Sequence, residues 1–529
     1  MEPSCIRQDL IPGASRLFSN YLYNFPEVGK FYPGGAPNVQ EVEQAARSLS
    51  FSDQRRGAIV SALREQNQDS AAALAQLDKL AQPGTAAIVS GQQVGLFSGP
   101  AYTIFKALTA VRLAEHLEGQ GIPAVPIFWL ATEDHDLAEV DHAWVFNDKG
   151  TPAKISSSGL IASGGPAGVT PLTDLPLSEL STALGDLPFA AEVMEKVRSA
   201  YREGATLGGA FAEFLKDLLS DFGLLFLDPL KPAIRKLAAP FLLKAAQQTP
   251  QLVNALLERT RELESEGYHA QVLVEKDAAM LFLLSGNKRL ALRMKDNKFV
   301  SREGEICLNE VPALAERLSP NALLRPVLQD FLLPTVAYVA GPAEIAYFAQ
   351  SSVLYQLLLD RMPVIYPRNS FTLLDARAEK LMLRNHLRLP DLLDHQERIK
   401  GKIASRLVPK NLTAEFDQLQ NSLADSLSRL QEDLQAFDPT LEAAAQKSSA
   451  KILYQLEKLR CKTARETLRR DEKASADANY LINLVFPHKH QQERLYSIVP
   501  FLAKYGLDFP RALYAQTQLS CPDHMLRTF

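Results

Sequence analysis

The first two thirds of the chain contain short, continuous apolar runs that end in glycine or in polar turn residues. Ala86–Ser90 and Ala124–Ala131 are two such runs, and they are typical of buried parallel strands. The segment between them, residues 101–117, places apolar side chains at helical spacing and is followed by Gly119 and Gly121. Strand, helix and strand in this order predict a parallel βαβ unit with a right-handed crossover.

Two later apolar runs predict further strands of the same sheet: Thr335–Ala340 and Val364–Arg368. Residues 205–237 predict a helix, a strand and a helix, with Leu224–Asp228 as a buried strand. Gln271–Val300 predicts short strands with turns, which we interpret as an antiparallel insertion. The abundance of Gly, Ser, Pro and Thr in residues 150–175 predicts an exposed connection. Residues 1–80 predict helices with polar loops.

A heptad pattern replaces the strand signals after residue 375. Its apolar positions are Leu412, Phe416, Leu419, Leu423, Leu427, Leu430, Leu434 and Phe437. Asp438-Pro439 interrupts the pattern, and residues 440–475 predict a second helix, so we expect an antiparallel hairpin. Two interpretations stay open, because heptads do not specify the partner. The hairpin either folds back on the core or protrudes and forms a homodimer, and we expect its seam to bury Leu419, Leu423, Leu427 and Leu430.

These patterns together predict an α/β protein with a parallel-sheet core, insertions and a long helical hairpin. We predict the following division: residues 1–150, the N-terminal part of the core; 151–320, connecting insertions and further core elements; 321–375, the completion of the core; 376–480, the helical coiled-coil domain; 481–529, a segment that returns to the core.

Composition narrows the class of protein. The chain has 57 Lys plus Arg and 61 Asp plus Glu, for a net charge of −4, which gives no general attraction to nucleic acid or anionic lipid. Its four cysteines lie far apart, so we expect neither a disulfide framework nor a Cys-rich zinc site. The acidic N-terminus lacks an apolar stretch, so we expect no secretory signal. The long apolar segment Phe331–Gln350 predicts a strand, a turn and a helix rather than a membrane span. We therefore predict a cytoplasmic protein.

The first candidate for chemistry is the segment from Gly91 to Pro100, which follows a predicted strand and leads into a helix. Glycines allow close approach of the backbone to a ligand, and a helix N-terminus offers free N–H groups to an anion. The adjacent amides of Gln92 and Gln93 add hydrogen-bonding capacity that a purely structural turn does not need. Lys106, further along the helix, faces either a ligand or solvent.

The second candidate is Thr132-Glu133-Asp134-His135-Asp136, followed by Glu139, directly after the strand that ends at Ala131. Ligands bind at the carboxyl ends of strands in open α/β sheets. These side chains could orient a substrate amine, act as a base or bind a metal. The structural alternative is a helix N-cap formed by Thr132 or Asp134.

Two more candidates follow predicted strands in the same way. Glu344 and Tyr347 lie one helical turn apart after Gly341 and could face one pocket. Arg368 ends a strand, where an arginine can bind carboxylate or phosphate, with Ser370 or Thr372 capping the next helix. A structural N-cap and a surface ion pair are the alternatives. His269, His488 and His490 are isolated, and no nucleophile motif stands out.

Nearly end to end, the chain resembles the BshC family. The resemblance is carried by these motifs, in this order: Gly91-Gln92-Gln93-x-Gly95-Leu96-Phe97-x-Gly99-Pro100-x-Tyr102-Thr103, Trp129-x-x-x-Glu133-Asp134-His135-Asp136, Leu324-Arg325-Pro326-Val327-x-Gln329-Asp330, Gly341-Pro342-Ala343-Glu344-Ile345-Ala346-Tyr347, Pro367-Arg368 and Phe486-Pro487-His488-Lys489-His490-Gln491-x-Glu493-Arg494.

The resemblance implies a Rossmann-like core with connecting insertions and a coiled-coil domain, related to class I nucleotidyltransferases and aminoacyl-tRNA synthetases. It implies a ligase that joins cysteine to glucosaminyl-malate to give bacillithiol, with ATP as co-substrate and no firmly assigned cofactor. A nucleotide-binding scaffold that recruits a partner through its coiled coil, and a metal-dependent hydrolase, are the alternatives.

We therefore predict one pocket between the Gly91 segment, residues 133–136 and the start of the Gly341 helix. The catalytic candidates are Glu133, Asp134, His135 and Asp136, with no metal ligands expected. The candidates for substrate or nucleotide binding are Gly91, Gln92, Gln93, Gly95, Gly99, Tyr102, Gly341, Glu344, Tyr347 and Arg368.

Overall fold

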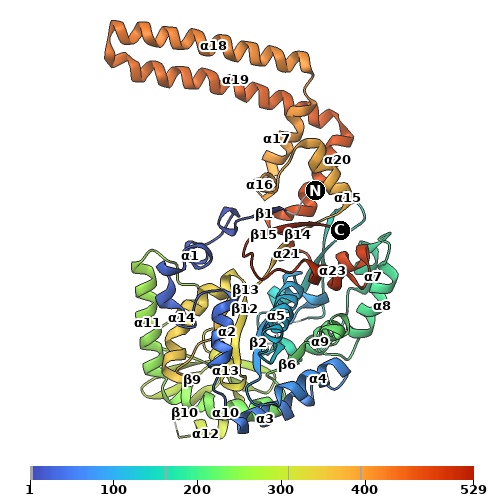
Figure 1. Cartoon of the computed structure of the whole chain (residues 1–529), viewed down its shortest axis with the longest axis vertical. Coiled ribbons are helices and arrows are strands. Elements are labelled where there is room, and N and C mark those ends of the chain that lie inside the picture. The colour runs from blue at the N-terminus through green and yellow to red at the C-terminus, as the bar shows by residue number, and fades with distance from the viewer. Residues whose placement is uncertain (1–3, 161–163, 308, 394–395) are drawn as a thin grey trace.

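The structure is a computed structural model that describes residues 4–160, 164–307, 309–393 and 396–529. A layered α/β body forms one end of the molecule, and a long helical hairpin projects from the other (Figure 1).

A five-stranded parallel sheet lies at the centre of the body, in the order β13-β12-β2-β3-β6. Its strands are β2 (Ala86–Gln93), β3 (Ala124–Ala131), β6 (Leu225–Leu227), β12 (Thr335–Ala340) and β13 (Val364–Pro367). The predicted strands are confirmed, and β3 and β12 have the predicted bounds. The sheet is covered on both faces, which is why its strands read as unbroken apolar runs.

Helices cover both faces of this sheet. On one face, α2 (Val39–Arg47) and α5 (Tyr102–Gly119) pack against Ile88 and Val339. Val89 and Ile127 point to the other face. The helices that cover that face are α3 (Asp53–Arg64), α4 (Ala71–Leu80), α10 (Pro232–Gln247), α11 (Thr249–Ser265), α13 (Arg325–Leu332) and α14 (Pro342–Leu358). The predicted helix over residues 101–117 is confirmed as α5, and α9 (Leu207–Leu218), β6 and α10 confirm the prediction for residues 205–237.

The predicted antiparallel insertion is confirmed as a second five-stranded sheet, in the order β10-β9-β8-β7-β11. Its strands are β7 (Ala278–Ser285), β8 (Lys288–Lys295), β9 (Lys298–Ser301), β10 (Gly304–Cys307) and β11 (Leu318–Pro320). It begins later than Gln271.

The prediction of an exposed connection over residues 150–175 is wrong in part. Residues 161–163 lie outside the described residues. In the remainder, β5 (Pro152–Ser156) pairs with β4 (His142–Phe146), and Gly168 and Leu172 are buried. A Cβ atom on Gly168 would lie 2.3 Å from the Thr132 Cβ, so this glycine permits close packing rather than a free loop.

The sequence did not predict a three-stranded sheet that joins distant parts of the chain. Its order is β1 (Ser4–Ile6), β15 (His524–Thr528) and β14 (Ser370–Leu374). Ser370 and Thr372 lie in β14 and hydrogen-bond to the two ring nitrogens of His524, at 2.6 and 2.8 Å. Their predicted role as caps is therefore wrong: Asp375 caps the next helix, α15 (Ala376–Asn385), by accepting from the Ala378 N–H.

The C-terminal segment packs against the body after the hairpin. Its helices are α20 (Glu472–Val485), α21 (Gln492–Leu495), α22 (Val499–Tyr505) and α23 (Phe509–Gln516). α22 contacts α8 (Ala190–Ala200), and α23 contacts α5. The domain boundaries given above stay predictions.

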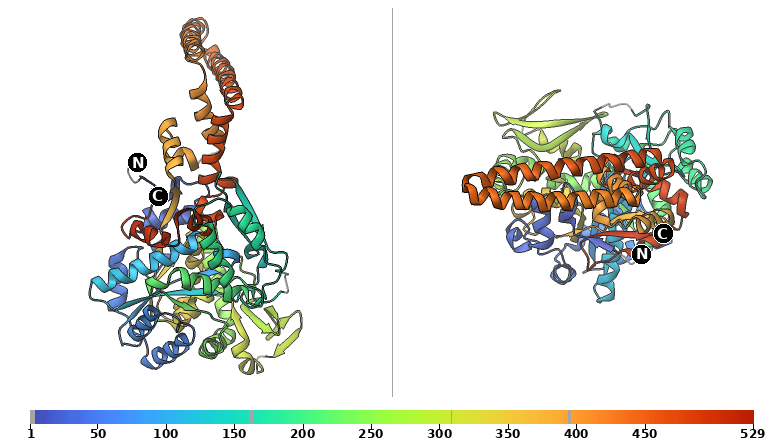
Figure 2. Two further views of the ribbon diagram at one scale, coloured as in Figure 1. Left: turned by 90° about the vertical axis from the view of Figure 1, so that its right-hand side faces the viewer. Right: turned by 90° about the horizontal axis from the view of Figure 1, so that it is seen from above.

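The predicted helical hairpin is formed by α18 (Lys410–Phe437) and α19 (Glu442–Arg470). It protrudes from the body, and only its base meets the neighbouring α17 (Gln396–Leu407) and α20 (Figures 1 and 2). Of the two interpretations of the heptads, folding back on the core is therefore wrong.

The seam is not buried as expected. No residue of α18 is buried; Leu423 and Leu427 are half-buried, whereas Leu419 and Leu430 are 48% and 52% exposed. The physical reason is that one returning helix covers only one side of a heptad seam. Phe437, Ile452, Tyr454 and Leu459 extend the exposed apolar surface along both helices.

No helix in the described ranges is both long and apolar enough to cross a membrane.

Candidate active site

The carboxyl ends of β2, β3 and β12 open into one cavity of about 470 Å³. The residues that line it include Gly91, Gln92, Gln93, Tyr102, Lys106, Glu133, Asp134, His135, Phe282, Arg289, Arg325, Tyr338, Gly341, Glu344, Tyr347, Arg368 and Arg494. The structure thus brings together the three segments that were predicted to share a pocket.

Gly91, Gln92 and Gln93 belong to β2, so their assignment to a turn is wrong. Pairing with β3 continues as far as Gln93 and Ala131, because β2 is a central strand. A Cβ atom on Gly91 would lie 2.8 Å from the Trp129 carbonyl oxygen, so a residue with a side chain would not fit at this position. The Gln93 amide donates to Asp134 Oδ2 at 2.6 Å and so links β2 to the segment after β3.

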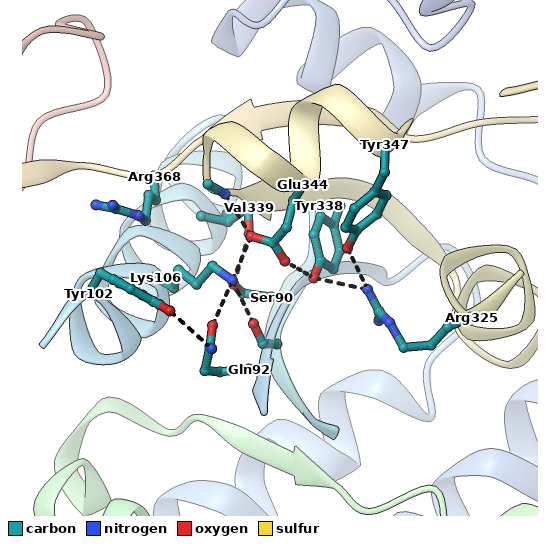
Figure 3. A network of polar contacts seen from close by, with 12 residues as sticks. Ser90, Gln92, Tyr102, Lys106, Arg325, Tyr338, Val339, Glu344, Tyr347 and Arg368 are labelled. Carbon is teal, nitrogen blue, oxygen red and sulfur yellow. Dashed lines mark hydrogen bonds and ion pairs between the residues drawn. The ribbon is translucent and has the colours of Figure 1, made fainter. Parts of the chain in front are cut away.

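Lys106 of α5 is the centre of a polar network on the floor of the cavity (Figure 3). Its ammonium group donates to the Gly91 carbonyl at 2.8 Å and to Gln92 Oε1 at 3.1 Å, and it lies 2.6 Å from Glu344 Oε2. The ammonium group has three N–H donors, so these contacts use all of them. Burial lowers the pKa of Lys106, and Glu344 acts in the opposite direction.

Glu344 ties the network to the start of α14. Its carboxylate accepts from the Gly341 N–H at 2.7 Å and from the Tyr338 hydroxyl at 2.7 Å. Burial alone would raise the pKa of Glu344, but Lys106 and these hydrogen bonds bring the pKa below its ordinary value. Glu344 is therefore an ionised structural group and not a free base.

Arg325 lies at the other side of this network, as Figure 3 shows, and has no carboxylate partner among the described residues. Its guanidinium donates to the Tyr347 hydroxyl at 2.9 Å and to Gln329 Oε1 at 3.3 Å. Burial raises the pKa of Tyr347 to about 12, so its hydroxyl stays protonated. Arg325 and Tyr347 thus provide hydrogen-bond donors at the cavity wall.

Arg368 lines the cavity, but its charge is already compensated. It lies 2.6 Å from Glu493 and donates to the Asn369 carbonyl at 2.9 Å. The surface ion pair considered as an alternative is wrong, because both side chains are at most 5% exposed. Arg494, which follows Glu493 in the sequence, lines the same cavity and makes no ion pair within the described part of the chain.

Side-chain contacts with other elements, and not the capping of a helix, fix the segment that follows β3. Glu133 is buried and lies 2.5 Å from Arg235 of α10. Asp134 Oδ1 accepts from the His135 N–H at 2.7 Å, and Thr132 donates to Asp228 at 2.5 Å. The helix that follows, α6 (Leu137–Val140), receives no side-chain cap, so the N-cap alternative for Thr132 and Asp134 is wrong.

His135 contacts the antiparallel insertion, a feature that local sequence could not reveal. Arg289 Nη1 of β8 lies 3.1 Å from His135 Nδ1, and the Phe282 ring of β7 lies 5.5 Å from the imidazole. Burial, followed by the Arg289 charge, lowers the pKa of His135 below 6.5. Arg289 carries no recognisable motif, because it lies in an ordinary β-hairpin sequence.

Several predicted residues do not line the cavity. Asp136 and Glu139 are exposed and outside it. Gly95 and Gly99 instead shape the turn before α5, where Gly99 has φ +62°. His488 packs against Trp144 with ring centroids 4.7 Å apart, and His490 lines a neighbouring cavity of about 280 Å³.

No group of three or more His, Cys, Asp or Glu side chains that could hold a metal ion is found in the described ranges.

Comparison with known proteins decides the family. The model of the bacillithiol biosynthesis BshC N-terminal Rossmann-like domain matches residues 1–369, and that of the BshC C-terminal coiled-coil domain matches residues 371–528. The chain belongs to the BshC family. Its BshC relatives include proteins named "Putative cysteine ligase BshC" from Solibacter usitatus, 48% identical, and from Koribacter versatilis, 35% identical, each covering 99% of both chains. A BshC of the same name from Salinibacter ruber is 32% identical over 93% of this chain and 92% of its own length.

Within the BshC family architecture, the cavity belongs mainly to the Rossmann-like domain. The family model of the coiled-coil domain nevertheless contains Arg494, which lines the cavity, and Glu493, the ion-pair partner of Arg368. Both residues follow the hairpin in the sequence.

Proposed function

We propose that this protein is a cysteine ligase of bacillithiol biosynthesis, which joins the carboxylate of cysteine to the amine of glucosaminyl-malate. The names of its full-length relatives support a ligase of this kind. The cavity at the carboxyl ends of the central strands supports the location of its active site.

The charge of the cavity is the observation that favours these substrates. Among the described lining residues, the cations are Lys106, Arg289, Arg325, Arg368 and Arg494, and the carboxylates are Glu133, Asp134 and Glu344. Lys106 pairs with Glu344 and Arg368 with Glu493, whereas Arg325 and Arg494 have no carboxylate partner there. An excess of positive charge fits anionic substrates, and the malyl group carries two carboxylates.

We propose ATP as the co-substrate, since joining a free carboxylate to an amine is unfavourable in water. Phosphoryl or adenylyl transfer to cysteine would give an activated carboxyl group. Attack by the amine would then form the C–N bond and break the C–O bond to the phosphate, with the amine proton leaving to solvent. The unpaired Arg494 supplies positive charge for such a phosphate.

The test is a reaction of purified protein with isotope-labelled cysteine, glucosaminyl-malate and ATP. We expect labelled bacillithiol only when all three components are present, together with one equivalent of either ADP or AMP, which identifies the activated intermediate. Product formation without ATP would overturn the proposed activation, and no product under any condition would overturn the ligase itself.

A further inference from the structure

Arg289 holds the imidazole of His135 although it belongs to the antiparallel insertion. Its own position is fixed, because Nε donates to Ser319 Oγ at 3.2 Å and Nη2 donates to the Pro320 carbonyl at 2.6 Å. The side chain is 7% exposed, and its guanidinium carbon lies 3.9 Å from the centre of the Phe282 ring. The remaining Nη1 group lies 3.1 Å from His135 Nδ1.

The chemistry of this contact determines which ring nitrogen carries hydrogen. A guanidinium has only N–H donors, so Nδ1 must be the acceptor. A protonated imidazole would set two donors and two positive charges against each other at this distance. His135 is therefore neutral, with its hydrogen on Nε2.

The other charged groups around His135 do not change this assignment. Asp134 Oδ1 is 3.7 Å from Nδ1 and accepts instead from the His135 backbone N–H. Asp136 follows on the same segment and, like Asp134, raises the pKa of His135, whereas burial and Arg289 lower it more. Nε2, across the ring, makes no hydrogen bond to any described residue, and the side chain is 43% exposed and lines the cavity.

We propose that Arg289 is a positioning residue that fixes His135 as the Nε2–H tautomer, so that His135 offers the substrate a hydrogen-bond donor and not a base. The target of this donor is a carboxyl or phosphate oxygen that gains negative charge as the amide forms. No proton moves to His135 in this step, and the amine proton goes to solvent. The identity of the substrate rests on the proposed function, but the tautomer does not.

The first test reads the tautomer directly, without substrate. In protein labelled with ¹⁵N-histidine, the signals of His135 are identified by their loss in H135Q. At neutral pH we expect an unprotonated Nδ1 and a protonated Nε2. R289M should give exchange between the two tautomers, whereas R293M, at an exposed position four residues further along the same strand, should leave the spectrum unchanged. A protonated Nδ1 in the wild-type protein would overturn the proposal, whether or not the protein is a ligase.

The second test separates a donor from a base. A glutamine side chain can place an N–H group near the Nε2 position but cannot accept a proton there. We expect H135A to lower kcat by about a hundredfold, as for loss of one oxyanion donor, and H135Q to recover to within about tenfold of wild type. An H135Q enzyme as inactive as H135A would assign His135 as the base and refute the proposal.

The third test uses the pH profile of kcat/KM. Neutral His135 is the active form, so activity falls as pH drops through its pKa. Loss of the Arg289 charge raises that pKa, so the acid limb of R289M should move to higher pH, and R289K should move less. R289K also retains an N–H donor, so it replaces R289M in this test if R289M does not fold. An acid limb that stays in place in both variants contradicts the proposal.

Discussion

The Lys106 ammonium and the Glu344 carboxylate lie 2.6 Å apart at the junction of α5, β2 and α14, with the Lys106 side chain only 3% exposed. Lys106 also donates to Gly91 and Gln92, so one side chain joins three segments of the cavity floor. Because all its donors are used within the protein, Lys106 holds the site together rather than binding substrate.

K106M should therefore destabilise the protein. It would leave Glu344 buried without its counter-charge, at a cost of about 3–5 kcal/mol. We expect lower midpoints in thermal and urea unfolding, and a double variant K106M/E344Q less destabilised than the sum of the single variants. The control is K298M, which removes the exposed pair with Glu305 and should not change the midpoints measurably. Unchanged midpoints in K106M would show that the ion pair does not stabilise the fold.

Arg325 should contribute to recognition of the malyl group. R325M removes a charged donor from the cavity wall, and hydrogen bonds to charged groups are worth roughly 1.5–3 kcal/mol. We expect the KM for glucosaminyl-malate to rise by about tenfold to a hundredfold, with little change in the KM for cysteine. For an analogue whose malyl carboxylates are replaced by amides, the KM should be the same for R325M and the wild-type protein. Equal loss with both compounds would mean that Arg325 acts only on the structure.

The protruding hairpin should pair with a second copy of the chain. Leu419 and Leu430 are about half exposed, whereas Leu423 and Leu427 are half-buried, so the two pairs test different surfaces of the hairpin. We propose a homodimer, since most assemblies of one chain are symmetric. L419D/L430D should sediment as a monomer with wild-type helicity, and L423D/L427D should also lose helical signal in the hairpin. S428D, at an exposed polar position, is the control. A wild-type monomer at tens of micromolar would disprove the dimer.

His524 should make stability depend on pH. Burial lowers its pKa to about 4, with Arg368 acting in the same direction and Glu493 opposing. The unfolded chain binds a proton near pH 6.5 but the folded chain does not, so stability is lost as pH falls from about 6.5 toward 4. Between pH 7 and 5 we expect a loss of about 2 kcal/mol.

H524Q should reduce that pH dependence, measured as the change in urea midpoint between the two pH values. Exposed His269 provides the matched control, because H269Q should keep the wild-type dependence. If H524Q and wild type lose the same stability on acidification, another group is responsible.

The sequence predicted the elements whose signal is local. β3 and β12 were placed correctly because unbroken apolar runs of that length are typical of strands buried on both faces. Gln92 and Gln93 were placed outside β2 because polar residues at a strand end resemble a turn. β15 was missed because His524 and Arg527 break the apolar pattern, although both are buried among partners distant in the chain.

The site was predictable only in part, for the same reason. Gln93, Asp134, His135 and Glu344 follow or end predicted strands, and strand ends meet at one edge of a sheet. Arg289 reaches His135 across 154 positions of the chain, and no local pattern encodes that contact. The ion-pair partner of a charged residue also determines the role of that residue. From the sequence, Glu133 is a candidate base. The structure shows that it forms a buried ion pair with Arg235, which is distant in the sequence.

The ion pair between Arg368 and Glu493 has a consequence for how the protein is made. The two partners are 125 positions apart, and the whole hairpin is translated between them. Until Glu493 leaves the ribosome, nascent Arg368 has no counter-charge, and the wall of the cavity formed by Arg494 does not exist. The Rossmann-like domain therefore cannot complete its own binding site while it is being synthesised, and the cavity closes only when the last segment of the chain docks.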